Sequence, residues 1–321
     1  MVNDDEPIPG PGEVSVAVLA AGVSFTDSLL RAGTYPGGPQ PPFTPGYEIV
    51  GVVTGIGAGC TTVSIGDHVA ALLVWGGYAE TVCIAESLAV KVPDDVDPAV
   101  LVSLIFPYLT AYQLLHRAAR IRLGETVLYH GAAGRVGVGV LELAGPAGVT
   151  VYGTASGSDC ALVERLGGVA IDYTRHDFLR YVRRLPGGGV DVAFDGIGGA
   201  LSYRSFRALR RGGRLILFGH QSTVCDGRRD ARRLAEFYAW AVAVLAIGLA
   251  TPHKRVGIYR IAKLRDQHPD WFRQDLQQLI HLLRDGTIHP VVAERIPLSE
   301  VRRAHELLGS SAAKGKIVLT P

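Results

Sequence analysis

A glycine-punctuated turn between a buried strand and an apolar helix is the most constraining feature of this sequence. Residues 126–144 read TVLYHGAAGRVGVGVLELA, with glycines spaced three apart at 131, 134 and 137. A strand that feeds such a turn presents backbone N–H groups and the positive end of a helix to phosphate, and glycine lets the backbone come close. Because both the strand and the helix are present, the pattern favours a dinucleotide-binding turn over one that binds nothing. The predicted contacts are Gly131, Ala132, Gly134, Arg135, Val136 and Gly137.

The chain repeats this strand–helix alternation downstream of the turn. Glycine pairs at 167–168 and 212–213 mark helix ends. The alternation predicts an α/β fold with a right-handed, doubly wound parallel sheet. The predicted strands cover 150–153, 169–172, 190–195 and 214–219, and the predicted helices cover 159–166 and 205–211.

Composition indicates a globular protein with no nucleic-acid partner. The chain has 321 residues and a net charge of +2, so it can hold two domains and shows no strong basic excess. Its one concentrated basic run, at 228–233, has no interleaved aromatic residue and is typical of a solvated helix start. The acidic, proline-rich N-terminus is no secretory signal, and the four scattered cysteines lack metal spacing. These features predict reduced thiols in a cytoplasmic chain.

The longest apolar run, 237–250, is too short to cross a bilayer as it stands. It therefore predicts a buried or interface helix and no membrane span.

The segments on either side of the strand–helix repeat predict a second, smaller domain. Residues 13–92 alternate apolar and polar positions between regular glycine turns, which is typical of a partly closed β domain. The segment from Pro290 onward, with a strand at 316–319, is expected to complete it.

Seven segments of the chain together indicate a known family. They are AAGVSFTDSLLRAGTYP (20–36), PFTPGYEIVG (42–51), GDHVAAL (66–72), LTAYQLLHRAARIRLGETVLYHGAAGRVG (109–137), DVAFDGIGG (191–199), RGGRLILFG (211–219) and IPLSEVRRAHELLGSSAAKGKIVL (296–319). In these segments the chain resembles the medium-chain dehydrogenase/reductase family, specifically its zinc-free quinone oxidoreductase branch, including members similar to vesicle amine transport proteins and to zeta-crystallin. The resemblance implies a Rossmann domain at 106–255 and a GroES-like domain at 1–105 and 256–321. It also implies that an N-terminal strand pair common in relatives is missing, which would expose a sheet edge.

The same resemblance implies a site without metal. Zinc-dependent relatives place a cysteine and a histidine where this chain has Ser24 and Tyr47, which are poor zinc ligands. His68 remains nearby and is expected to be structural. The implied activity is transfer of a hydride from NADPH to a small, apolar, electron-poor acceptor, a quinone or an α,β-unsaturated carbonyl.

The resemblance also supplies candidates for the reacting end of the substrate. Ser24, Tyr35 and Tyr47 are the candidate catalytic residues. Ser24 stands where many relatives have asparagine. Tyr47 is either the proton donor or structural, with water as the alternative proton source. Spacing on a predicted helix favours an ion pair between Asp27 and Arg31.

Cofactor contacts follow in part from the residues and in part from the family. The second strand of the repeat ends without an acid, which favours NADPH and leaves NADH possible. Asp159 would repel a 2′-phosphate if it pointed inward. The remaining expected contacts are Thr110, Thr154, Ser156, Tyr173, Gly196, Phe218, Gly219, His220 and Lys316.

Two questions stay open on the sequence alone. A non-catalytic, crystallin-like cofactor-binding protein of the same fold is the alternative function. The resemblance further implies a homodimer, with the strand after Phe218 and the apolar segment 237–250, including Val244 and Leu245, as its contact. A lid over the substrate is the rival interpretation of that segment.

Overall fold

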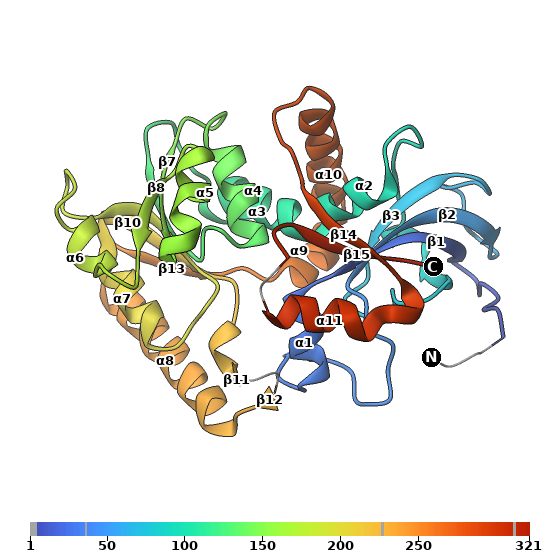
Figure 1. Ribbon diagram of the computed structural model, residues 1–321, viewed down its shortest axis with the longest axis horizontal. Coiled ribbons are helices and arrows are strands. Elements are labelled where there is room, and N and C mark those ends of the chain that lie inside the picture. Colours follow the sequence, from blue (N-terminus) through green and yellow to red (C-terminus); the bar gives the residue numbers. More distant parts are fainter. Residues whose placement is uncertain (1–4, 36, 226–227, 311–312) are drawn as a thin grey trace. The chain divides into compact units, whose positions relative to one another are not determined.

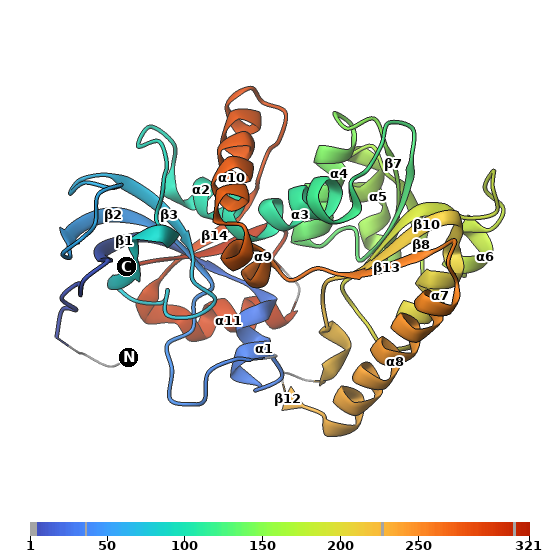
Figure 2. The same ribbon diagram turned by 180° about the vertical axis from the view of Figure 1, so that it is seen from behind.

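The computed structural model describes residues 5–35, 37–225, 228–310 and 313–321, which form two compact units (Figures 1 and 2). The first unit contains Met1–Leu109, Ala262–Arg284 and His289–Pro321. The second contains Thr110–Ile261 and Asp285–Ile288. The first unit therefore brings together segments from both ends of the sequence.

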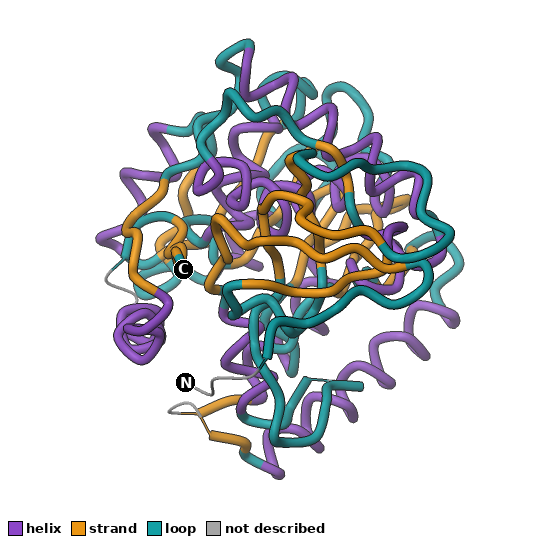
Figure 3. The backbone as a smooth tube through the Cα atoms, turned by 90° about the vertical axis from the view of Figure 1, so that its right-hand side faces the viewer, coloured by secondary structure: helices purple, strands orange, loops and turns teal. Residues whose placement is uncertain are grey.

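A seven-stranded sheet forms the first unit, with strand order β14-β15-β1-β2-β3-β5 and β4 paired to β1. The C-terminal strand β15 runs antiparallel to β1, and Figure 3 shows these strands in orange. Two register shifts between β1 and β2 let the sheet bend. The strands are β1 (Glu13–Val23), β2 (Glu48–Ile56), β3 (His68–Leu72), β4 (Thr81–Ala85), β5 (Val90–Lys91), β14 (Val292–Pro297) and β15 (Lys316–Thr320).

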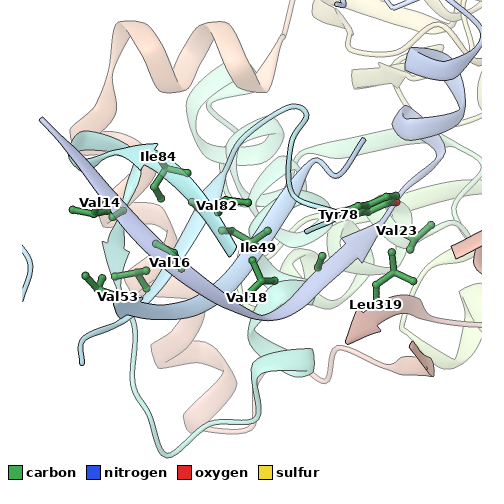
Figure 4. Packing of buried hydrophobic residues seen from close by; sticks show 14 of the residues in the cluster. Val14, Val16, Val18, Val23, Ile49, Val53, Tyr78, Val82, Ile84 and Leu319 are labelled. Carbon is green, nitrogen blue, oxygen red and sulfur yellow. The ribbon is translucent and has the colours of Figure 1, made fainter. Parts of the chain in front are cut away.

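The core of this unit lies on one face of the curved sheet (Figure 4). Alternate residues of β1 point into it, because successive side chains of a strand face opposite sides. Val14 and Val16 are fully buried there, together with Ile49 and Leu319 from other strands. The helices of this unit are α1 (Phe25–Arg31), α2 (Pro98–Ser103), α10 (Pro269–Arg284) and α11 (Val301–Ser310), while α9 (Ile261–Gln267) begins at the boundary between the units.

The second unit is a doubly wound parallel sheet with strand order β13-β10-β9-β6-β7-β8. The chain winds outward from β6 to β8, crosses back, and continues from β9 to β13, so the order reverses between β6 and β9. This confirms the predicted α/β fold. The strands are β6 (Thr126–His130), β7 (Thr150–Ala155), β8 (Val169–Asp172), β9 (Val190–Asp195), β10 (Leu209–Leu217) and β13 (Arg255–Ile258).

Helices cover both faces of this sheet. In Figures 1 and 2, α4 and α5 lie on one face, and α6, α7 and α8 lie on the other. A short hairpin, β11 (Val224–Cys225) with β12 (Arg228–Arg229), precedes α8. The helices are α3 (Leu109–Gln113), α4 (Arg135–Ala144), α5 (Cys160–Arg165), α6 (Phe178–Val182), α7 (Ala200–Ala208) and α8 (Ala231–Ala250).

One predicted helix boundary is wrong. The sequence places a helix at 205–211, but α7 ends at Ala208 and β10 begins at the next residue. Leu209 pairs with Val190 and Arg214 with Val192, so the intervening residues form an irregular part of the strand. The glycine pair at 212–213 therefore belongs to this irregularity, with Gly212 at φ +85°, and does not cap the helix.

The apolar segment 237–250 also differs from its prediction, because its helix begins earlier. Helix α8 has 20 residues, so its length does not exclude a membrane span, and two charged side chains, Arg232 and Arg233, lie in its first turn. By length and composition both 98–119 and 231–250 could cross a membrane, which is weak evidence. In the most apolar 18-residue window of each stretch, 78% of 98–119 is buried, as expected of a core helix, whereas only 6% of α8 is.

A buried ion pair crosses the sheet of the first unit. Lys316 on β15 and Glu48 on β2 flank β1, and their side chains meet over Gly22. A Cβ at Gly22 would overlap the Glu48 carboxylate and lie 2.6 Å from Lys316 Cε, so only glycine fits there. Lys316 is 2% exposed. This pairing argues against the cofactor-phosphate contact implied for Lys316, because its buried ammonium is bound to a carboxylate.

We expect Lys316→Met to lower the free energy of unfolding by about 3 kcal/mol, because it leaves the Glu48 charge buried without its partner. The double variant Lys316→Met/Glu48→Gln removes both charges and is expected to recover most of that loss. Urea unfolding followed by circular dichroism measures both effects. A double variant no more stable than Lys316→Met would contradict this account.

Candidate cofactor and catalytic sites

The predicted glycine turn joins β6 to α4 at the point where the strand order reverses. Ligands of open α/β sheets bind at this place, beyond the carboxyl ends of the strands. Gly131 has a φ of +71°, which favours glycine. A Cβ at Gly134 would lie 3.1 Å from the carbonyl oxygen of Gly131, and one at Gly137 would overlap the backbone of Ala132. The turn is therefore packed backbone against backbone.

The backbone N–H groups of the turn fall into two sets: some donate within the fold, and others, at the start of α4, have no acceptor within the helix. Gly131 N donates to Thr154 Oγ1 at 3.3 Å, and Ala132 N donates to Thr154 O at 2.9 Å. Gly134 N donates to Gly131 O, which closes the turn. Val136 and Gly137 lie in the first turn of α4, where N–H groups have no acceptor within the helix. The start of α4 therefore presents the N–H groups and positive helix end that a pyrophosphate requires.

Arg135 is the first residue of α4. Its φ is not among the positive values of the described chain, so the arginine causes no backbone strain there. It brings a positive charge to the start of the helix.

The ends of β9 and β10 form the neighbouring part of the candidate cofactor site. A Cβ at Gly219 would lie 2.8 Å from Gly196 Cα, and one at Gly196 would lie 2.6 Å from the Phe218 ring. Burial, followed by the charge of Arg260, lowers the pKa of His220 to about 4, so this histidine is neutral at pH 7. The four predicted residues Gly196, Phe218, Gly219 and His220 are thus brought together.

Asp195 organises this loop, a role that the sequence analysis missed. Its buried carboxylate accepts hydrogen bonds from Ile197 N at 2.9 Å, Gly198 N at 3.0 Å and Ser202 Oγ at 2.6 Å. The pattern Asp-Gly-Ile-Gly-Gly was a usable signal, because an aspartate before glycines commonly caps the following backbone.

Thr110, which the family resemblance implies as a contact near the nicotinamide, has a buried hydroxyl that lacks a hydrogen-bond partner. Its side chain is 3% exposed, and its Oγ1 has no hydrogen-bond partner within the described chain. A buried hydroxyl without a partner costs free energy, so it calls for an explanation. A bound cofactor amide would supply the missing partner.

The hydroxyls expected to receive a 2′-phosphate are engaged elsewhere. Thr154 is 3% exposed and contacts the glycine turn, as described above. Ser156 Oγ donates to Asp159 Oδ2 at 2.9 Å. Tyr173 is 59% exposed at the neighbouring strand end, where it can pack on an adenosine. Neither hydroxyl therefore offers its proton to phosphate in this geometry.

Acidic side chains gather around the same loop. The carboxylate of Asp172 lies 3.0 Å from the position of a Cβ on Gly157. Burial raises the pKa of the Cys160 thiol, and the charges of Asp172, Glu164 and Asp159 raise it further. The local field is therefore negative, which opposes a 2′-phosphate.

A buried polar network in the first unit is centred on Asp27. Its Oδ2 accepts from Ser24 N at 2.8 Å, from Ser24 Oγ at 2.9 Å and from Tyr78 OH at 3.1 Å. Its Oδ1 accepts from Gly46 N at 3.2 Å. Burial raises the pKa of Asp27, and the hydrogen bonds from Ser24 oppose that shift.

This network corrects the predicted ion pair between Asp27 and Arg31. Asp27 is fully buried, whereas Arg31 is exposed, so the two side chains face different environments. Helical spacing had suggested a contact that burial prevents.

The three candidate catalytic residues lie in the first unit. The single proton of the Ser24 hydroxyl is donated to Asp27, so Ser24 offers only lone pairs to a ligand. Tyr35 OH and Tyr47 OH are 2.9 Å apart. Tyr47 is 1% exposed and packs on Phe106, with ring centroids 4.6 Å apart, while Tyr35 is half-buried. The two tyrosines form a hydroxyl pair that can pass a proton.

Metal ligands are not clustered in the described part of the chain. No group of three or more histidine, cysteine, aspartate or glutamate side chains is arranged there to hold a metal ion.

Comparison with known proteins agrees with this architecture. The description "Alcohol dehydrogenase GroES-like domain" matches residues 10–94, and "Zinc-binding dehydrogenase" matches 167–319. A 2-haloacrylate reductase from Burkholderia sp is 32% identical over 98% of this chain and 92% of its own length. The chain belongs to the medium-chain dehydrogenase/reductase family.

Two further family members illustrate its range. The Synaptic vesicle membrane protein VAT-1 homolog of Danio rerio is 30% identical over 99% of this chain, which spans 66% of that relative's length. The structure of Escherichia coli quinone oxidoreductase complexed with NADPH has a TM-score of 0.84 and 26% identity, covering 100% of this chain and 95% of that one. The predicted quinone oxidoreductase resemblance is thus confirmed.

The Asp27 network gives a stability prediction. Asp27→Asn places an amide donor against either Gly46 N–H or the Ser24 and Tyr78 donors, so we expect a loss of about 2–3 kcal/mol in the free energy of unfolding. Ser24→Ala removes one donor and leaves the carboxylate, and it should cost about 1 kcal/mol. Urea unfolding compares the two. Equal stabilities would show that Asp27 does not depend on its negative charge.

Proposed function

We propose that this protein is an NADPH-dependent oxidoreductase that delivers a hydride to a quinone or an α,β-unsaturated carbonyl without a metal ion. The observation that carries the proposal is the glycine turn at the reversal of strand order, followed by the first turn of α4, where the N–H groups of Val136 and Gly137 have no acceptor within the helix. The quinone oxidoreductase and 2-haloacrylate reductase relatives support the substrate class. When bound, the nicotinamide would supply the hydride.

The chain's own groups would bind and orient. Val136, Gly137 and Arg135 hold the pyrophosphate at the start of α4, and Thr110 Oγ1 hydrogen-bonds the nicotinamide amide. The buried ends of β9 and β10 exclude water, since Gly196, Phe218 and Gly219 pack closely there. Positioning of this kind supplies much of the rate when the acceptor is already electron-poor.

Proton delivery is assigned to the tyrosine pair. The two phenol hydroxyls lie 2.9 Å apart and either can donate to the other, so a proton can pass between them. The half-buried Tyr35 is the outer member, and the buried Tyr47 can restore its proton. Ser24 is less suited to donate, because its proton is committed to Asp27.

We expect Tyr35→Phe and Tyr47→Phe each to lower kcat by about 100-fold, the lower end of the usual contribution of a general acid. Stopped-flow and steady-state assays with NADPH or NADH, against a panel of quinones and enones, measure this. Tyr181→Phe is the matched control, because Tyr181 is exposed on α6, belongs to neither candidate site, and its change should leave kcat unchanged. Activity should survive chelation by EDTA. Loss of activity with EDTA that added zinc restores would overturn the metal-free proposal.

Cofactor choice is the second measurable part of the proposal. The acids around 156–159 should keep the preference for NADPH modest, and Asp159→Lys should raise the ratio of NADPH to NADH affinity about tenfold or more. Fluorescence titration gives both dissociation constants. Gly134→Val is the site control: it should weaken both cofactors about tenfold, whereas Gly145→Val at the exposed helix end should not. An unchanged ratio in Asp159→Lys would show that Asp159 lies away from the 2′ position.

A non-catalytic cofactor-binding protein is the second candidate, favoured by the commitment of the Ser24 proton to Asp27. The same assays separate the two. Tight cofactor binding without turnover of any quinone or enone would establish the second candidate.

The exposed face of α8 suggests the proposed homodimer. Tyr238, Val242 and Leu249 are 46%, 66% and 89% exposed and follow one helical stripe. Helix α8 itself contacts β13, the edge strand of the sheet, whose Ile258 is 59% exposed. An apolar stripe next to an unpaired edge fits a second copy of the chain, because a two-fold axis would cover both at once. Val244, predicted as a contact, is instead fully buried in the core of the second unit.

We expect Val242→Glu/Leu249→Glu to convert the dimer to a monomer in light scattering while cofactor binding persists. Leu123→Glu, an equally exposed apolar position in the same unit, is the control and should leave the dimer intact. An unmodified protein that is monomeric and pellets with lipid vesicles would instead make α8 a membrane-contacting helix. Cys60, Cys83 and Cys160 are free thiols, which supports the cytoplasmic location proposed with this assembly.

A further inference from the structure

His130 lies at the end of β6, directly before the glycine turn, and is 5% exposed. Its ring joins two elements that are far apart in the sequence. Nδ1 is 3.2 Å from Thr154 Oγ1 on β7, and Nε2 is 2.9 Å from Ser205 Oγ on α7. The ring also packs edge-on against Phe178, with centroids 4.7 Å apart. These contacts fix the orientation of the imidazole.

The direction of each hydrogen bond follows from counting protons. Ser205 Oγ is 2.8 Å from the carbonyl oxygen of Leu201, which can only accept. We assign its single hydrogen to that bond, so that His130 Nε2 carries a proton and donates to Ser205. A neutral imidazole has one N–H, so Nδ1 is then an acceptor.

The other side of the ring is ordered in the same way. Nδ1 can accept only from Thr154 Oγ1, whose single hydrogen points to the ring. The lone pairs of Thr154 Oγ1 are left to accept from Gly131 N at 3.3 Å. The ring is neutral at pH 7, because burial lowers the pKa of His130 to about 4; the charge of Asp195 opposes this shift and that of Arg204 adds to it.

We propose that His130, Thr154 and Ser205 are positioning residues for the pyrophosphate turn, linked in one proton order from Gly131 N–H through Thr154 and His130 to Ser205 and Leu201. This inference rests on the proposed cofactor function and changes the role of Thr154. The threonine holds two successive N–H groups of the turn, Gly131 through its side chain and Ala132 through its carbonyl. It is therefore not itself a phosphate ligand.

This series of hydrogen bonds affects the turn because the turn is tightly packed against α4. Gly137, in the first turn of α4, packs so closely on Ala132 that a Cβ would overlap its carbonyl. A shift of Gly131 and Ala132 therefore displaces the N–H groups that face phosphate. Removing the Thr154 hydroxyl releases Gly131 N–H from its inward bond and should weaken cofactor binding without removing any cofactor contact.

Two threonine variants test the hydroxyl. Thr154→Val keeps the shape and loses the hydroxyl, and we expect it to weaken NADPH and NADH binding equally, by about tenfold. Thr154→Ser keeps the hydroxyl and should bind within about twofold of the unmodified protein. Equal loss for both cofactors separates positioning from a 2′-phosphate contact, which would affect NADPH alone. Fluorescence titration measures binding, and thermal unfolding confirms that both variants are folded.

Two histidine variants test the hydrogen bonds of the two ring nitrogens separately. The amide of Asn reaches the place of Nδ1 and can accept from Thr154, whereas the amide of Gln reaches the place of Nε2 and can donate to Ser205. We expect His130→Asn to keep most of the cofactor affinity and His130→Gln to lose about fivefold to tenfold. Equal affinities in the two variants would overturn the assignment of the turn to the Thr154 side.

The proton order has its own spectroscopic signature. In the unmodified protein, ¹⁵N-edited NMR should show His130 in the Nε2–H form at pH 7, and Ser205→Ala should disturb it. An Nδ1–H form, or unmodified affinity in both Thr154→Val and His130→Gln, would overturn the inference. An unmodified protein that binds neither cofactor would overturn the proposed function instead, and the tautomer would still be measurable.

Discussion

Close approach of backbone to backbone at the end of β6 is the constraint on which the second unit depends. The parallel sheet reverses its order between β6 and β9, and the chain must leave β6, turn and enter α4 within four residues, 131–134. Gly131 supplies the left-handed conformation, and Gly137 removes the side chain that would keep α4 away from the turn. The result is a helix end whose N–H groups face outward at the reversal, where open α/β sheets bind ligands.

In the first unit, glycines make room for buried charged groups. Gly22 on β1 leaves space for Lys316 and Glu48 to meet from the flanking strands, and Gly46, at φ +111°, brings its N–H to Asp27. Buried charges are costly unless they are paired and hydrogen-bonded. Glu48 is paired with Lys316, and Asp27 accepts four hydrogen bonds, so these carboxylates serve the architecture of the unit more directly than they serve chemistry.

Features set by local pattern were predictable from the sequence, and features set by tertiary burial were not. The glycine turn and the alternating strands follow from spacing, and the structure confirms the fold that they predict. The predictions of an Asp27–Arg31 ion pair and of Val244 as a dimer contact were wrong. Periodicity identifies which residues share a face of a helix, but it does not show what covers that face. His130 and Ser205 are 75 residues apart, so their contact had no local signal.

Assigning each hydroxyl proton to its acceptor shows which groups in either unit can still donate a hydrogen bond to a ligand. The hydroxyls of Ser24 and Ser156 donate inward, to Asp27 and Asp159. In the proposed proton order Thr154 also donates inward, to His130. The groups that remain for a ligand include the backbone N–H groups of Val136 and Gly137 and the Thr110 hydroxyl. Under the proposed function, backbone donors would bind the pyrophosphate that both nicotinamide cofactors share. The acids of the loop at 156–159 would then oppose the 2′-phosphate of NADPH, which reduces any preference for that cofactor over NADH.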